Sequence, residues 1–253
     1  MQRAWIAIGS LATVVALGFG TFSVIGVLAH EEVTETATFD GADITAIDVD
    51  AENGSVEIIG GEGDEIRLVA EISHGLRPTS HRAEVEGSTL VVRSSCPFFD
   101  TWCHVDYQLE VPADVAVTAN VDNGHVTVRD VTGDVDVDGD NGSVELARLT
   151  GSLDASTDNG SVVATGLRSA AVRADSDNGR VSLSFAEPPE NVQATSNNGS
   201  VEIVLPEGDE SYHVEADTHH GSTDVAVRTD PDSDRLIVGR TSNGSVTVRY
   251  PSG

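Results

Sequence analysis

The sequence predicts an all-β fold: a parallel β-solenoid (β-helix) with about 18–23 residues per coil, preceded by one N-terminal transmembrane helix. Three observations predict it: a recurring Asn-Gly dipeptide, strand-like alternation on both sides of each dipeptide, and an uncharged segment near the N-terminus. A fixed repeat with strand alternation is typical of stacked coils. The uncharged segment, at residues 4–29, is long enough to cross a bilayer.

The N-terminal segment sets the expected location of the domain. Arg3 precedes the uncharged residues, whereas Glu31 and Glu32 follow them, and this asymmetry favours a cytoplasmic N-terminus. We therefore expect a cytoplasmic stub at 1–3, a single-pass anchor in the cell membrane at 4–29 and an extracytoplasmic C-terminal domain. A secretory signal is the alternative for the same segment, and it also predicts export.

Beyond the membrane segment we expect a spacer at 30–39 and a solenoid over 40–250, with an irregular segment at 60–112 that lacks the repeat. The chain has two cysteines, Cys96 and Cys103, and both lie in that irregular segment. Disulfides persist in exported compartments, so we expect one bridge between them. Together with the neighbouring His104, the pair offers too few ligands for a zinc site.

The repeat is defined by the glycine of each dipeptide. In the second half of the chain the glycines are separated by 18, 18, 19, 20, 22 and 23 residues, and in the copy at Gly221 a histidine, His220, replaces the asparagine. Aliphatic residues stand two and four positions after most of these glycines and seven positions before them, as in strands with one buried face. The predicted turn residues are Asn53, Gly54, Asn123, Gly124, Asn141, Gly142, Asn159, Gly160, Asn178, Gly179, Asn198, Gly199, Asn243 and Gly244.

Asn-Gly turns also join antiparallel hairpins, so a hairpin-built barrel or sandwich is an alternative. The register favours the solenoid. Equivalent positions carry equivalent residues from copy to copy, as expected when each coil lies in register on the previous one and like residues stack about 4.8 Å apart. In that arrangement the stacked asparagines form an amide ladder.

This pattern resembles a family of exported bacterial and archaeal β-strand-repeat domains of uncharacterised function, commonly labelled "putative adhesins". The resemblance covers about residues 40–250 and rests on the Asn-Gly-Ser-Val copies, on the run at 108–112 leading into Val115 and Val117, and on the preceding membrane segment. It implies a parallel β-solenoid at the cell surface and no catalytic residues.

The charge is strongly acidic: 14 basic residues, all of them arginine, stand against 42 acidic ones, for a net charge of −28. Nucleic acids and anionic lipid headgroups are therefore poor partners for this surface. Two positions before the glycine, four consecutive copies carry aspartate, and stacking would align them in a column: Asp122, Asp140, Asp158 and Asp177. Calcium or another hard cation could screen such a column, and a solvated acidic edge is the simpler interpretation.

The sequence therefore favours a non-enzymatic interaction or structural module of the cell envelope, adhesin-like and without a cofactor. Its expected partners are the membrane, through the N-terminal helix, and an envelope protein or glycan of unknown identity. A cation-dependent binding module that uses the aspartate column is one alternative, and a carbohydrate-active β-helix enzyme is another. Against the enzyme, the one local histidine cluster, His213, His219 and His220, lies in no recognisable catalytic motif.

Overall fold

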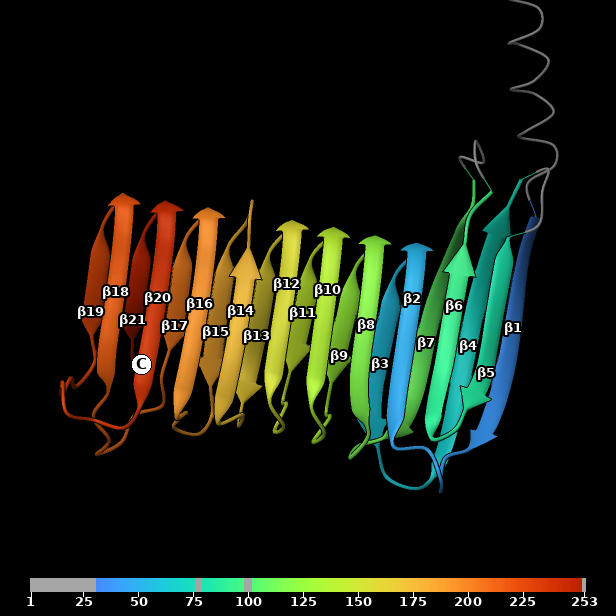
Figure 1. Cartoon of the computed structure of the whole chain (residues 1–253), viewed down its shortest axis with the longest axis horizontal. Helices are drawn as coiled ribbons and strands as arrows, with labels where there is room; N and C mark the ends of the chain where they lie inside the picture. The colour runs from blue at the N-terminus through green and yellow to red at the C-terminus, as the bar shows by residue number, and fades with distance from the viewer. Residues whose placement is uncertain (1–30, 76–78, 98–101, 252–253) are drawn as a thin grey trace, which may run out of the picture.

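The computed structural model describes residues 31–75, 79–97 and 102–251. These residues form two β-sheets that lie face to face along the length of the molecule (Figure 1). The eleven-stranded sheet has the order β1 (Glu31–Asp40), β4 (Glu65–His74), β7 (His104–Pro112), β3 (Val56–Gly61), β9 (Val126–Arg129), β11 (Val144–Ala147), β13 (Val162–Leu167), β15 (Val181–Phe185), β17 (Val201–Val204), β21 (Val246–Arg249) and β19 (Thr223–Ala226).

The ten-stranded sheet runs in the matching order along the other side of the molecule. Its strands are β18 (His213–His220), β20 (Leu236–Asn243), β16 (Asn191–Asn198), β14 (Ala171–Ser176), β12 (Leu153–Asn159), β10 (Val135–Asn141), β8 (Ala116–Asn123), β2 (Ala46–Asn53), β6 (Thr89–Ser95) and β5 (Ser80–Glu86).

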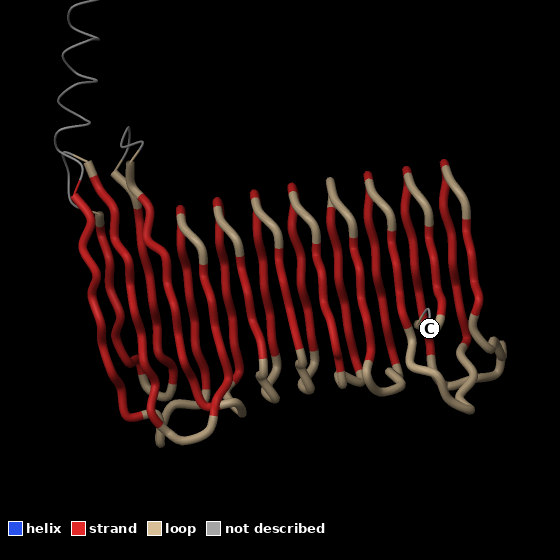
Figure 2. The backbone as a smooth tube through the Cα atoms, turned by 180° about the vertical axis from the view of Figure 1, so that it is seen from behind, coloured by secondary structure: helices blue, strands red, loops and turns tan. Residues whose placement is uncertain are grey.

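Each Asn-Gly copy forms one coil, with one strand in each sheet. The asparagine ends the strand of the ten-stranded sheet, except that β14 already ends at Ser176, two residues before Asn178. The chain then crosses to begin a strand of the eleven-stranded sheet, so these turns are not hairpins. Neighbouring coils pair in parallel with the repeats in register: Val135 lies beside Val117 and Leu153, for example, and Val144 lies beside Val126. The tube in Figure 2 shows the crossings repeated at the same height along the stack.

The hydrophobic core fills the narrow space between the two sheets. Val117, Val135 and Leu153 enter it from the ten-stranded sheet, and Val128 and Leu146 enter it from the other. All are nearly inaccessible to solvent. Aliphatic side chains of this size suit the short distance between the sheets, which accounts for the low share of aromatic residues.

The predicted fold class, a purely parallel solenoid preceded by a transmembrane helix, is wrong. Both sheets are mixed, because β4 pairs antiparallel with β1 and β7, and β5 pairs antiparallel with β6. These strands lie at the N-terminal end, in residues without the repeat, and they cover the first coils. The described residues contain no helix, and none that could cross a membrane. The segment predicted to span, 4–29, lies outside the described residues.

Two further expectations need correction. Residues 31–39, expected as a spacer, belong to β1, which pairs with β4 along ten residues. The order of coils also departs from the sequence order, because β20 lies between β16 and β18, and β21 lies between β17 and β19. The last coil of the sequence, formed by β20 and β21, is thus inserted before the coil of β18 and β19, which ends the stack.

Candidate binding surface

All of the predicted turn asparagines except Asn53 form the amide ladder that the sequence predicts. From coil to coil, each asparagine Nδ2 donates to the Oδ1 of the asparagine before it in the stack, with distances of 3.0–3.2 Å. The bonded series is Asn123, Asn141, Asn159, Asn178, Asn198 and Asn243. At the start of the series, Asn123 donates instead to the backbone oxygen of Glu52. Asn243 bonds directly to Asn198, and His220 is not part of the ladder, because the coil that contains Asn243 lies between the other two.

A second ladder, which we did not predict from the sequence, lies just inside the first. A hydroxyl three residues before the turn glycine donates to the carbonyl oxygen of the glycine in the neighbouring coil, at 2.8–3.0 Å. The donors are Thr157, Ser176, Ser196, Thr218 and Thr241. Their recurrence three positions before the glycine is visible in the sequence and could have revealed this ladder. The two ladders fix the relative height of the coils that they join, and so they hold the outer strand faces of those coils in register.

The predicted disulfide is present between Cys96 and Cys103, with a Cα to Cα distance of 5.7 Å. It lies between the end of β6 and the start of β7, where the chain crosses from one sheet to the other. β6 and β7 pair in parallel with β2 and β3, so they form a coil without an Asn-Gly turn. The disulfide therefore closes the crossing at the position where the other coils use Asn-Gly.

Reduction of this disulfide should lower the stability of the N-terminal end. Removing a cross-link over so short a loop costs about 2–3 kcal/mol in the chain-entropy account, which corresponds to a fall in Tm of roughly 5–10 °C. Thermal unfolding with and without reductant measures the fall. The Cys96→Ser, Cys103→Ser double variant should match the reduced protein and should not respond to reductant. Equal midpoints for oxidised and reduced protein would contradict this role.

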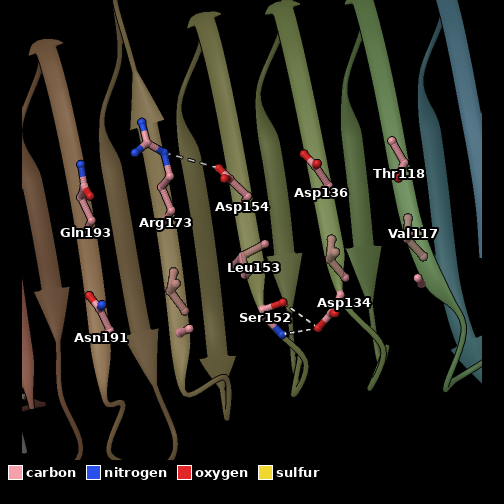
Figure 3. Close-up of a pocket in the computed structure, with 14 residues that line it drawn as sticks. Val117, Thr118, Asp134, Asp136, Ser152, Leu153, Asp154, Arg173, Asn191 and Gln193 are labelled. Atoms are coloured by element: carbon pink, nitrogen blue, oxygen red, sulfur yellow. Dashed lines mark hydrogen bonds and ion pairs between the residues drawn. The ribbon is translucent and has the colours of Figure 1, made fainter.

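The outer face of the ten-stranded sheet presents a shallow groove of about 430 Å³. It crosses β8, β10, β12, β14 and β16, and one row of in-register side chains runs along it (Figure 3). That row consists of Thr118, Asp136, Asp154, Arg173 and Gln193. Consecutive members come from neighbouring strands, so they are spaced by about the 4.8 Å strand separation.

Some of the polar groups in the groove form hydrogen bonds and ion pairs with one another. Asp134 accepts hydrogen bonds from both the backbone N–H and the hydroxyl of Ser152, at 2.8 and 2.6 Å. Arg173 lies between two carboxylates, 3.7 Å from Asp154 and 2.7 Å from Asp175. The groove thus offers carboxylate, amide, hydroxyl and guanidinium groups on rigid strands, which can exchange hydrogen bonds with a polar ligand without a large loss of side-chain freedom.

Three of the four aspartates proposed as a cation column lie on the neighbouring strands β8, β10 and β12, and the fourth, Asp177, follows the last residue of β14. In the part of the chain that the structure describes, no three His, Cys, Asp or Glu side chains gather closely enough to hold a metal ion. Asn197 Nδ2 donates to Asp177 Oδ1 at 2.6 Å. The carboxylate of Asp177 thus has an amide partner within the protein.

The pKa values of Asp122 and Asp130 are shifted in opposite directions, which predicts opposite effects of their substitution on stability. Partial desolvation, and then the charges of Asp140, Glu52 and Asp50, raise the pKa of Asp122, so its ionised form destabilises the fold at pH values above that pKa. Hydrogen bonding from Arg148 lowers the pKa of Asp130, so its ionised form stabilises the fold above the unfolded pKa of about 4.

We expect Asp122→Asn to raise Tm slightly at pH 7 and Asp130→Asn to lower it slightly. Both effects are small because Asp122 is exposed and the side chain of Asp130 is still 39% exposed. Both differences should vanish near pH 2, where the carboxyl groups are protonated in the folded and unfolded states. Thermal unfolding at the two pH values is the measurement. A fall in Tm at pH 7 for Asp122→Asn would show that its neighbours do not repel it.

The fold and the surface together define a class of protein: a β-strand-repeat domain of stacked coils with an open polar groove on one sheet. Within that class, the family model Toastrack DUF4097 matches residues 110–252, more than half of the chain. The chain belongs to this family. A comparison with curated proteins gave no match.

The chain is also similar to solved structures. A protein described as a "putative adhesin" from Bacteroides fragilis NCTC 9343 is 15% identical, with a TM-score of 0.54 over 85% of this chain and 97% of that one. A "putative cell adhesion protein" from Clostridium sporogenes ATCC 15579 is 10% identical, with a TM-score of 0.45 over 87% of this chain and all of that one. At such identities the first likeness establishes the fold alone.

Proposed function

We propose that the protein is a non-enzymatic, adhesin-like interaction module of the cell envelope, and that it binds a linear glycan along the outer face of the ten-stranded sheet. The observation that carries the proposal is the row of polar side chains in the groove. Because the coils are in register, the row repeats hydrogen-bonding groups at even spacing, and a linear polymer of sugars offers hydroxyl groups at regular intervals to such a row.

The proposed location outside the cytoplasm is supported by the disulfide between Cys96 and Cys103. Such bridges persist in exported proteins and are rare where thiols are kept reduced. The net charge of −28 also suits a ligand rich in hydroxyl groups, since hydroxyl groups donate to carboxylates, whereas anionic polymers would be repelled.

Affinity electrophoresis of the purified protein through gels that contain neutral polysaccharides tests the proposal. The variant Asp136→Ala, Asp154→Ala, Gln193→Ala removes three members of the row and should weaken binding at least tenfold. Its control is Glu57→Ala, Glu145→Ala, Glu202→Ala on strands β3, β11 and β17 of the opposite sheet, which should bind as the wild type does. Equal binding by the groove variant and the wild type would contradict the proposed site.

Two added measurements separate the alternatives. Release of new reducing ends from a bound polysaccharide, abolished by single carboxylate substitutions, would favour a carbohydrate-active enzyme. Loss of binding on chelation, restored by calcium but not by monovalent salt at the same ionic strength, would favour the cation-dependent module. For the non-enzymatic module we expect polysaccharide of unchanged length and binding that does not respond to chelation.

A further inference from the structure

The end of the stack formed by β18 and β19 is open. In the column of core residues four positions after the turn glycine, Val128, Leu146 and Val248 are almost fully buried, whereas Val225 of β19 is 39% exposed. On β18, Val214 and Ala216 are only partly buried. Within the described residues, β18 pairs only with β20 and β19 pairs only with β21. The core of the domain therefore continues to a face without a neighbouring strand.

On that side, Tyr212 forms a parallel bridge with Thr229 just before β18 begins, and among the described residues the backbone of β18 itself has unpaired groups there. The N–H of His213 donates to Arg235 O on the side of β20, at 2.8 Å. Because successive residues of a strand direct their backbone groups to alternate sides, the N–H and C=O groups of Val214 and Ala216 point to the open side. β18 is eight residues long and contains no proline, which are the properties of an edge that can accept another strand.

The charges on β18 indicate which strand would fit. Glu215 and Asp217 point outward, and Arg240 of the neighbouring strand β20 donates to Glu215 at 2.7 Å. Arginine from an adjacent strand can thus reach these carboxylates. A second copy of this chain would oppose Glu215 and Asp217 with acidic groups of its own, and each copy carries a net charge of −28.

We propose that β18 receives an extended segment of another protein as an additional strand, and that this segment alternates apolar residues with arginine or lysine. The apolar side chains would cover Val214, Ala216 and Val225, while the basic ones would pair with Glu215 and Asp217. Backbone hydrogen bonds supply the pairing, and the alternation supplies the specificity. This site is at the end of the stack, so it is independent of the groove on the sheet face.

Fluorescence anisotropy with labelled synthetic peptides of seven residues tests the proposal on the full-length protein. One peptide alternates valine with arginine, a second alternates valine with glutamate, and a third has the composition of the first with its arginines adjacent. We expect the alternating arginine peptide to bind at least tenfold more tightly than either of the other two. Equal binding of the arginine peptides would overturn the proposal, because it would indicate attraction by net charge alone.

Two variants locate the site. Glu215→Lys with Asp217→Lys should reverse the preference to the glutamate peptide. Its control, Glu71→Lys with Glu110→Lys, changes the net charge equally on exposed residues at the far end of the stack and should retain the original preference. Ala216→Pro removes an N–H that points to the open side of β18. It should weaken the binding of every peptide at least tenfold, while the circular dichroism spectrum of the protein stays unchanged. Unchanged preference in the double lysine variant would overturn the proposal.

Discussion

Gly160→Ala should destabilise the protein by about 3 kcal/mol or more, a large effect for the addition of one methyl group. A Cβ at this position would overlap the carbonyl oxygen of Gly142 in the neighbouring coil, at less than the 3.0 Å that real Cβ atoms respect. The obstacle is backbone, so no side-chain rotation can relieve it. The turn glycines are therefore required by the close approach of stacked coils.

Gly139→Ala provides the matched control in the adjacent coil. Gly139 is buried in β10, but a Cβ there would have no neighbour closer than 3.7 Å. Alanine also restricts the unfolded chain, so we expect a gain of about 0.5–1 kcal/mol. Urea unfolding of both variants gives the two free energies. A Gly160→Ala variant as stable as the wild type would show that the turns are not stacked this closely.

Val248→Ala should cost about 2–3 kcal/mol, whereas Val225→Ala should cost less than about 1 kcal/mol. The two valines are register partners on β21 and β19, and the same two carbon atoms are removed in each case. Val248 is 0% exposed because β17 and β19 cover it on both sides, but Val225 belongs to the last strand and is 39% exposed. Only the burial differs.

Urea unfolding of these two variants measures the contrast, with the slope of the transition as a check that both variants unfold in the same manner. If the coils followed the sequence order, Val248 would be in the terminal coil and the ranking would reverse. A larger loss for Val225→Ala would therefore contradict the inserted position of β20 and β21.

The repeating part of the fold could be predicted because the same residue types recur at the same offsets. Asn141 and Asn159 lie 18 residues apart, and this regularity gives the strands, the register and the amide ladder at once. The cysteine pair was equally informative, since the chain contains no other cysteine. In these coils the local sequence pattern agrees with the tertiary structure, so the pattern alone was sufficient to predict the strands and their register.

The two ends of the stack could not be predicted in the same way. The antiparallel pairing of β1 with β4 depends on contacts between residues that carry no repeat and are far apart in the sequence, from Asp40 with Glu65 to Glu31 with His74. The position of the last coil did leave a signal. His220 interrupts the asparagine series and β18 carries Glu215 and Asp217, whereas β20 carries Leu236, Ile237 and Val238, and the more apolar strand takes the covered position.

The groove on the ten-stranded sheet was also missed. Its row of polar residues follows from the register, but the alternating positions that point outward are read in a single sequence only as solvated strand faces. Asp136, Asp154 and Arg173 form a candidate site because three neighbouring strands place them side by side. The only candidate site that we recognised in the sequence was the aspartate column beside the turns, for which a solvated acidic edge was the simpler interpretation.

The order of the coils determines which strand is the open edge, and disulfide cross-linking tests that order most directly. Thr195 of β16 and Arg240 of β20 are register partners, and Arg240 is in turn the partner of Asp217 on β18. Neighbouring strands lie about 4.8 Å apart, within reach of a disulfide, whereas strands separated by another strand are about twice as far apart, beyond its reach. We expect Thr195→Cys with Arg240→Cys to cross-link on mild oxidation, and Thr195→Cys with Asp217→Cys to remain reduced. The opposite result would mean that β18 lies next to β16, and it would contradict both the inserted coil and the open edge proposed for binding.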